Sequence, residues 1–325
     1  MRIEASPAQA KTILKAMFAV AAAGPAVTDA DRASIVAAAR YIFRLTLAPD
    51  LAGMAPASRQ ELEALAANPD LATEAVRFAT VMAFVDGALD HAKLEAVLGL
   101  AATLGVTADF VHDIAEVAQG HLRDATSHMI RANLESLTGK SWSTDDAMGW
   151  LMPYKGKNAD PALAARFRAL TALPEETFGH AFATFYLANK YAFPGEEQAL
   201  NFAFATSHDS SHLLAGYDTT PRGELLVSTF TAAMHRSHAM SGHVLPVIFS
   251  WHLKVQINEV AGDAGGALDP REFWHAWAAG AAATVDTFAP GWEFWSYVEV
   301  PLGALRERWS IPAAGLDANM DFGAP

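Results

Sequence analysis

The chain has 325 residues, of which 52% are hydrophobic and 18% charged, and this composition excludes an intrinsically disordered protein. Its 36 aspartates and glutamates outnumber 23 lysines and arginines, and the net charge of −13 argues against a broad nucleic-acid-binding surface. Because there is no cysteine, any metal must be bound by His, Asp, Glu or carbonyl oxygen.

The sequence predicts no membrane-spanning helix. Pro25 interrupts the apolar run at residues 16–27, and the run at residues 244–251 is far shorter than the roughly 20 apolar residues that cross a bilayer. The N-terminal run also lacks the pattern of a secretory signal. We therefore expect a soluble or peripheral protein, with the cytoplasm as its compartment.

The first third of the chain is expected to be entirely helical. Apolar residues recur at the 3.6-residue period in four segments, residues 13–20, 35–42, 78–85 and 94–101. Turn and capping signals separate them: Gly24-Pro25, Thr28, Asn68-Pro69-Asp70 and Asp86-Gly87. No segment alternates in the manner of a strand, so the fold class is all-α.

A weak internal repeat joins residues 19–42 with residues 83–104. In each copy a helix ends at a turn and an acidic helix start follows. The second copy, with Asp86-Gly87 and Glu95, resembles TerB-like helical domains of tellurite-resistance proteins. Two ordinary helical hairpins that pack on each other would give the same pattern, and this alternative stays open.

The composition changes near residues 140–160, where we place a domain boundary. All eight tryptophans lie at or after Trp142, and residues 155–161 have the composition of a connector. The predicted domains are residues 1–140, TerB-like, and residues 141–325, a helical bundle. Within the second domain we expect a helix over residues 174–191, with Glu175 and Glu176 in its first turn.

The histidines that could carry chemistry are concentrated in one segment, since six of the twelve lie between residues 208 and 252. On a helix, His208 and His212 are four residues apart and share a face, which Asp209 borders. Asp218 and Pro221 predict the cap and first position of a second helix, with Glu224 in its first turn. If the two helices pack together, this set of nitrogen and oxygen ligands suits zinc or iron(II).

A plainer interpretation of these residues stays open. Asp209 as a surface acid, Glu224 as a charge that complements a helix N-terminus, and a chance histidine spacing would give the same pattern. Three further histidines, His235, His238 and His243, are expected on a helix surface or in satisfied hydrogen bonds rather than in a second metal centre.

The pattern H-D-x-x-H, then eleven residues, then E, filled by His208, Asp209, His212 and Glu224, resembles the motif of the fourth Coq protein family of coenzyme Q (ubiquinone) biosynthesis. Residues 173–179 and 292–306 resemble flanking segments of that family. The resemblance implies an all-helical fold, a metal held by the motif residues and peripheral association with the inner face of the cytoplasmic membrane. It also implies oxidative decarboxylation at ring carbon one of polyprenylated hydroxybenzoate precursors, and the organisation of other quinone-biosynthesis proteins.

Three hypotheses for function follow. The first is a metal-dependent protein of ubiquinone biosynthesis, with His208, His212 and Glu224 as ligands and Asp209 as a ligand or a base beside one; Asp209 and Glu224 are its candidate catalytic residues. The second is a non-catalytic scaffold that binds a prenyl lipid, because residues 204–207 lack the basic residues usual in the family. The third is metal-assisted hydrolysis.

The expected partners are a polyprenylated aromatic substrate or isoprenoid lipid, other quinone-biosynthesis proteins and a second copy of the chain, but no nucleic acid. An apolar tail needs an apolar groove, which aromatic side chains could line, although ordinary core packing is the alternative. The aromatic residues concerned are Phe178, Phe182, Phe185, Trp251, Phe273, Trp274, Trp277, Phe294 and Trp295.

Overall fold

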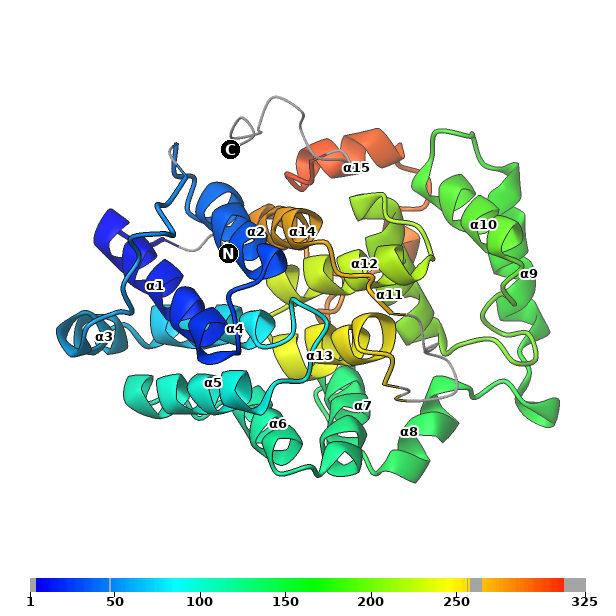
Figure 1. Ribbon diagram of the computed structural model, residues 1–325. Coiled ribbons are helices and arrows are strands. Elements are labelled where there is room, and N and C mark those ends of the chain that lie inside the picture. Colours follow the sequence, from blue (N-terminus) through cyan, green and yellow to red (C-terminus); the bar gives the residue numbers. More distant parts are fainter. Residues whose placement is uncertain (1–3, 47, 256, 258–264, 313–325) are drawn as a thin grey trace.

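The computed structural model describes residues 4–46, 48–255, 257 and 265–312, and in these residues every named element is a helix. Two isolated bridges, Thr177–Pro301 and Leu253–Gly265, are the β-type pairings found there. The predicted all-α class is therefore confirmed for the described part of the chain (Figure 1).

The α-helices are α1 (Pro7–Ala23), α2 (Asp29–Ala37), α3 (Arg59–Ala66), α4 (Pro69–Met82), α5 (His91–Leu104), α6 (Asp109–Ala118), α7 (Leu122–Thr138), α8 (Thr144–Leu151), α9 (Pro161–Ala169), α10 (Phe178–Asn189), α11 (Phe202–Ala215), α12 (Pro221–Met234), α13 (Leu245–Val247), α14 (Pro270–Ala282) and α15 (Leu302–Arg308). Three π-helical segments are η1 (Ala38–Ile42), η4 (Ala239–Val244) and η5 (Ile248–His252). Short 3₁₀ turns are η2 (Gly156–Asn158), η3 (Leu170–Ala172) and η6 (Phe294–Ser296).

The internal repeat is longer in the structure than the sequence pattern suggested. Helices α1 and α4 both begin with a capping residue followed by proline, Ser6-Pro7 and Asn68-Pro69. Helices α2 and α5 follow, and the same offset relates their third residues, Asp31 and Lys93, which lie 62 residues apart in the chain. The repeating unit is thus a pair of helices with matching start signals.

The two copies meet at a buried ion pair between those equivalent residues. Lys93 Nζ donates to Asp31 Oδ1 at 2.9 Å and to Asp86 Oδ2 at 2.6 Å. The Lys93 and Asp31 side chains are 1% and 0% exposed. Burial opposes the charge of Lys93, but its hydrogen bonds to Asp86 and Asp31 outweigh this and raise the pKa of Lys93 above its usual value. An ammonium group therefore joins α2 to α5.

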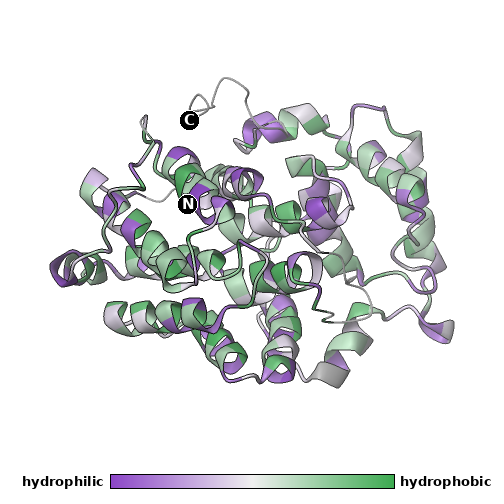
Figure 2. Ribbon diagram, viewed as in Figure 1, coloured by the Kyte–Doolittle hydropathy of each residue, from purple (hydrophilic) through white to green (hydrophobic). Residues whose placement is uncertain are grey.

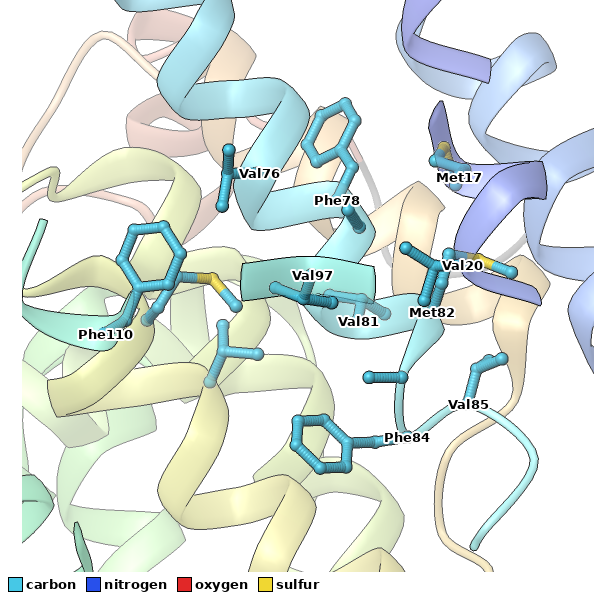
Figure 3. Packing of buried hydrophobic residues seen from close by; sticks show 14 of the residues in the cluster. Met17, Val20, Val76, Phe78, Val81, Met82, Phe84, Val85, Val97 and Phe110 are labelled. Atoms are coloured by element: carbon cyan, nitrogen blue, oxygen red, sulfur yellow. The ribbon is translucent and has the colours of Figure 1, made fainter. Parts of the chain in front are cut away.

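One large hydrophobic cluster combines the repeat helices with helices from the second half of the chain. Figure 3 shows its centre, where Phe78, Val81 and Met82 of α4 pack near Met17 and Val97. The cluster continues into α14, where the Trp274 ring lies 4.6 Å from that of Phe78, and Trp274 Nε1 donates to Ser34 Oγ at 2.8 Å. Because this core extends across residue 140, the division into two domains stays a prediction.

A second cluster, rich in aromatic residues, lies between α9, α10, α11 and α15. Phe178, Phe182 and Phe294 belong to it, whereas Phe273, Trp274 and Trp277 belong to the first cluster, and all six are 0–2% exposed. These six aromatic residues therefore belong to the hydrophobic core, which was the alternative to an apolar groove. Helix α12 contributes to both clusters, through Leu225 to the first and Phe230 to the second.

The predicted helix at residues 174–191 is wrong at its start, because α10 begins at Phe178. Thr177 caps it by accepting a hydrogen bond from His180 N. The amides of Phe178 and Gly179 donate to the carbonyls of Val300 and Val298, so a distant segment satisfies the first turn. Glu175 and Glu176 lie in the turn before the helix.

Polar residues cover the outer sides of peripheral helices such as α3, as the hydropathy colouring in Figure 2 shows. Among the described residues, no helix has both the length and the apolar character needed to cross a bilayer.

Candidate metal centre

Helices α11 and α12 bring His208, His212 and Glu224 together through a short connection. Gly216, in the left-handed region with φ of 77°, ends α11. Asp218 Oδ1 accepts hydrogen bonds from the amide and hydroxyl of Thr220, and Thr220 Oγ1 caps α12 by accepting from Gly223 N. Pro221 occupies the first helical position, which confirms the predicted start of this helix.

A glycine is required at position 223 because Asp218 packs directly against its Cα. A Cβ at Gly223 would lie 2.1 Å from both the carbonyl and a carboxylate oxygen of Asp218. The absence of a side chain therefore lets the turn fold against the first turn of α12, which sets the position of Glu224.

The two imidazoles and the carboxylate converge on one point. His208 Nε2 lies 3.7 Å from Glu224 Oε2, and His212 Nε2 lies 3.5 Å from Glu224 Oε1. One ligand atom from each of the three residues lies within 4.8 Å of the others. The His212 side chain is 1% exposed, and its Nε2 atom has no hydrogen-bond partner. A buried nitrogen that lacks a partner is uncommon and calls for an explanation.

The opposite ring nitrogens are both held by oxygen atoms. His212 Nδ1 lies 3.1 Å from the carbonyl oxygen of Tyr217, and His208 Nδ1 lies 3.1 Å from Asp209 Oδ1. Because a carbonyl oxygen only accepts, Nδ1 of His212 carries a proton, so in the neutral form of the ring the lone pair of Nε2 is directed towards Glu224. Protein metal sites hold their histidine ligands in this way.

Asp209 is placed beside the three converging residues rather than among them. Its Oδ2 atom accepts a hydrogen bond of 2.5 Å from the hydroxyl of Tyr186, and its Oδ1 atom faces His208. Burial and the charge of Asp209 raise the pKa of Tyr186 well above its usual value, so the hydroxyl stays protonated. Of the two roles expected for Asp209, this arrangement matches that of a base beside a ligand.

Electrostatics at the site favour opposite charges. Burial opposes a charged His208, but the hydrogen bond with Asp209 and the charges of Glu224 and Asp209 outweigh it and raise the pKa of His208. Burial opposes a charged Glu224, but the close approach of His212 and the charges of both histidines lower its pKa. Protons and a cation would therefore compete for the same nitrogen atoms.

Aromatic rings flank both imidazoles. Phe204 stacks on His208 with ring centroids 5.4 Å apart, and Phe185 lies 5.6 Å from His212. The side chains of His208 and Glu224 are each 22% exposed, so the site is open to solvent on one side. At the end of α10, Leu187 is 54% and Tyr191 44% exposed.

The later histidines take part in hydrogen bonds, as expected. His235 Nδ1 lies 2.8 Å from Asp286 Oδ2, and its Nε2 lies 2.9 Å from the carbonyl of Ser136. His243 Nε2 lies 3.1 Å from Ser136 Oγ. His238 Nδ1 lies 2.5 Å from Asp109 Oδ2.

A different group of possible ligands, Glu116, His121 and Asp124, lies at the turn between α6 and α7. His121 Nδ1 is 2.9 Å from Glu116 Oε2, and the His121 side chain is 53% exposed. An exposed pair of this kind is adequately described as a surface ion pair.

Sequence reasoning missed the Tyr217 carbonyl, which faces His212 Nδ1, and the Tyr186 hydroxyl, which donates to Asp209. No spacing signal connects Tyr186 to Asp209, because they come from different helices, and a backbone carbonyl carries no sequence signal.

The donor set fits a divalent ion. Two neutral imidazoles and one carboxylate, with further positions open, form the usual protein contribution to catalytic zinc and to non-haem iron(II). Comparison with known proteins adds no relative: no family model, curated protein or solved structure matches this chain.

Proposed function

We propose that His208, His212 and Glu224 bind one divalent cation, zinc or iron(II), and that the protein uses it in ubiquinone biosynthesis. The observation that carries the proposal is the buried Nε2 atom of His212, which lacks a hydrogen-bond partner and faces Glu224 at 3.5 Å. A bound cation would satisfy this nitrogen. The fixed Nδ1 atoms of both rings support the same interpretation.

The proposed substrate is a polyprenylated hydroxybenzoate-type acid, on the strength of the motif resemblance. When bound, a divalent cation supplies a Lewis acid for the carboxylate and phenolic oxygens of such a ring. Asp209 accepts a hydrogen bond from His208 Nδ1 and so keeps the proton on that nitrogen. Glu224 supplies a negative charge that offsets the charge of the cation. Phe185 and Phe204 provide apolar surface beside the imidazoles.

The overall reaction proposed is oxidative decarboxylation at ring carbon one. The carboxylic acid group leaves as carbon dioxide and a hydroxyl group from water takes its place, which is a two-electron oxidation of the substrate; with dioxygen as the oxidant, the two electrons and two protons that are released form hydrogen peroxide. The reaction therefore requires an oxidant such as dioxygen, and a site with two histidines and one carboxylate is typical of iron(II) oxygenases.

Metal analysis tests the site directly. Purified wild type, His212→Ala and Glu224→Ala would be loaded with zinc, or with iron(II) without oxygen, and then dialysed. We expect an equimolar amount of metal in the wild type and near-zero amounts in both variants. His91→Ala, which alters a 70% exposed histidine, is the matched control and should retain metal. Equal, near-zero metal in all four proteins would reject the proposal.

A non-catalytic scaffold that binds an isoprenoid lipid is the second candidate. Two observations favour it: Leu187 and Tyr191 are exposed at the end of α10, and residues 204–207 contain no basic side chain. Peripheral membrane contact would then be apolar and local, because the net charge of −13 does not attract anionic lipid. Lipid extraction with mass spectrometry separates the two, since conversion of a carboxylated precursor rejects the scaffold and bound isoprenoid without turnover favours it.

A further inference from the structure

Tyr186 donates a hydrogen bond to the carboxylate of Asp209, which in turn faces His208. Its ring lies in α10 and is 2% exposed, and its hydroxyl donates to Asp209 Oδ2 at 2.5 Å. Asp209 is 6% exposed and uses its other oxygen, Oδ1, to face His208 Nδ1 at 3.1 Å. The three residues form a continuous chain of hydrogen bonds that ends at a proposed ligand.

The position of the Tyr186 hydroxyl is fixed by aromatic packing. Phe182 and Phe193 lie stacked against the Tyr186 ring at centroid distances of 4.7 Å and 5.2 Å. Tyr191 contacts it edge-on at 5.8 Å. Because the ring cannot move freely, the hydroxyl is preorganised towards Asp209.

The two imidazoles differ in what holds them. The Nδ1 atom of His212 faces a backbone carbonyl, that of Tyr217, whereas Nδ1 of His208 faces a side chain. A carboxylate rotates about its Cβ–Cγ bond, so a second contact is needed to fix the orientation in which one of its oxygens faces His208. Tyr186 supplies that contact from a different helix.

We propose that Tyr186 is a positioning residue, which acts through Asp209 to keep His208 protonated on Nδ1 with Nε2 free to bind a cation. The value of this arrangement to the protein rests on the proposed function. The arrangement itself is a property of the metal-free chain and can be measured without a metal.

Nitrogen-15 NMR of the histidine side chains in the metal-free full chain is the direct test. At alkaline pH, where the ring is neutral, we expect His208 to be the Nδ1–H tautomer in the wild type. Tyr186→Phe keeps the ring and removes the hydroxyl, and it should give a mixture of tautomers at His208. Tyr154→Phe is the matched control, because the Tyr154 hydroxyl accepts from Phe202 N at the start of the same helix, α11, without contacting Asp209.

Cation binding supplies a second readout. For Tyr186→Phe, zinc or cobalt(II) affinity should fall about tenfold to a hundredfold, the usual effect of removing a partner of a metal ligand. In Asp209→Asn, adding Tyr186→Phe should produce little further loss, because both changes interrupt the same chain of contacts. A merely structural role for Tyr186 would give additive losses.

The outcomes separate this inference from the proposed function. If His208 stays the Nδ1–H tautomer in Tyr186→Phe, the positioning role is rejected whatever the metal content. If the tautomer changes but the wild type binds no metal, the positioning role holds and the proposed function fails.

Discussion

At the scale of single residues, the candidate centre depends on spacing within one helix and on a close turn after it. The four-residue separation of His208 and His212 and the capped start of the next helix predicted which side chains would meet. Asp209 was expected beside the histidines, but the Tyr217 carbonyl that faces His212 and the Tyr186 hydroxyl that donates to Asp209 could not be predicted in this way. Tyr186 lies 23 residues from Asp209, and only the packing of α10 against α11 brings them into contact.

Replacing Gly223 should weaken the centre without touching a ligand. In Gly223→Ala the new methyl would overlap Asp218, so α12 must shift and Glu224 with it. We expect cation affinity to fall by about tenfold or more, and the free energy of unfolding to fall by about 1–3 kcal/mol.

Gly303→Ala is the control for this change, because a Cβ at Gly303 in α15 would meet no atom within 4 Å. It should leave cation affinity unchanged and stabilise the protein by about 0.5–1 kcal/mol. Titration calorimetry and denaturant unfolding measure the two effects, and equal affinities for both variants would contradict the role given to Gly223.

At the scale of elements, capping signals predicted helix starts well and packing decided the rest. Ser, Thr, Asn or Asp caps α1, α2, α4 and α5, two of them, Thr28 and Asn68, at positions the sequence had indicated. The start of α10 was misplaced because a distant segment bonds its first amides. The π-helical segments η1, η4 and η5 had no sequence signal, since such segments are set by tertiary contacts.

The buried lysine between the repeat copies should be costly to remove. Lys93→Met keeps an apolar stem but leaves the carboxylates of Asp31 and Asp86 without their counter-charge. Removing one partner of a buried ion pair typically costs about 3–5 kcal/mol. Denaturant unfolding measures this loss.

Lys15→Met provides the comparison, because Lys15 pairs with Glu61 where the side chains are 17% and 33% exposed. Its loss should cost about 0–1 kcal/mol. Comparable losses of unfolding free energy in the two variants would show that the buried Lys93 pair contributes no more to stability than the more exposed Lys15 pair.

At the scale of the whole molecule, contacts between distant segments join the repeat to the half of the chain that contains the candidate metal centre. The hydrogen bond between Trp274 and Ser34 spans 240 residues, and one hydrophobic cluster includes helices from both halves. No periodic pattern in a single sequence reveals which distant faces will meet. This is why the sequence predicted helices correctly and still suggested a boundary at residue 140 that the core crosses.

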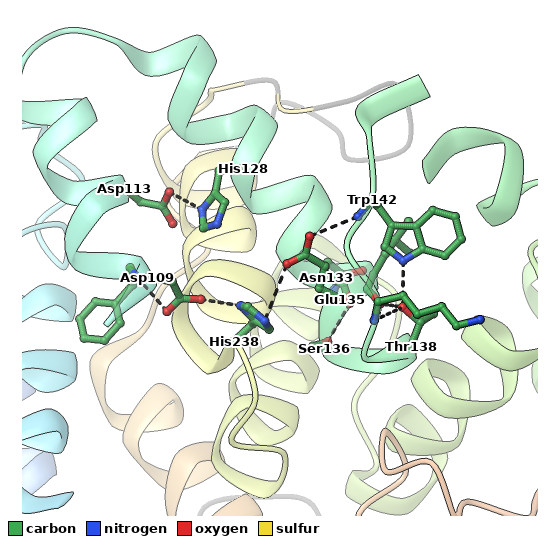
Figure 4. Close-up of polar contacts among 12 residues, drawn as sticks. Asp109, Asp113, His128, Asn133, Glu135, Ser136, Thr138, Trp142 and His238 are labelled. Carbon is green, nitrogen blue, oxygen red and sulfur yellow. Dashed lines mark hydrogen bonds and ion pairs between the residues drawn. The ribbon is translucent and has the colours of Figure 1, made fainter. Parts of the chain in front are cut away.

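Two pairs of histidine and aspartate, one within the first half and one that joins the two halves, should make stability depend on pH. Figure 4 shows His128 beside Asp113, and His238 of the segment before η4 beside Asp109 of α6. The hydrogen bond to Asp113 raises the pKa of His128, and that to Asp109 raises the pKa of His238, both from 6.5. Glu135 adds to the effect on His238 and Arg131 opposes that on His128.

Because both pKa values are raised in the folded state, the stabilisation is complete below pH 6.5 and is lost as pH rises through the folded values. We expect the free energy of unfolding to fall over that range. The double variant His128→Gln, His238→Gln should be less stable than wild type at pH 6 and should show a smaller fall. Parallel pH profiles would contradict this role. His91→Gln, at an exposed position, should follow the wild type.

The ion pair between Asp31 and Lys93 also shows how the two copies of the repeat depart from exact symmetry. Two separate, identical subunits related by a two-fold axis would have to present the same side chain at this position, and so would bring like charges together in a buried place. Opposite charges at equivalent positions require copies that differ in sequence, as the two copies within this polypeptide do. The tandem arrangement thus permits a buried ion pair between equivalent positions, which a symmetric homodimer of the same unit could not form.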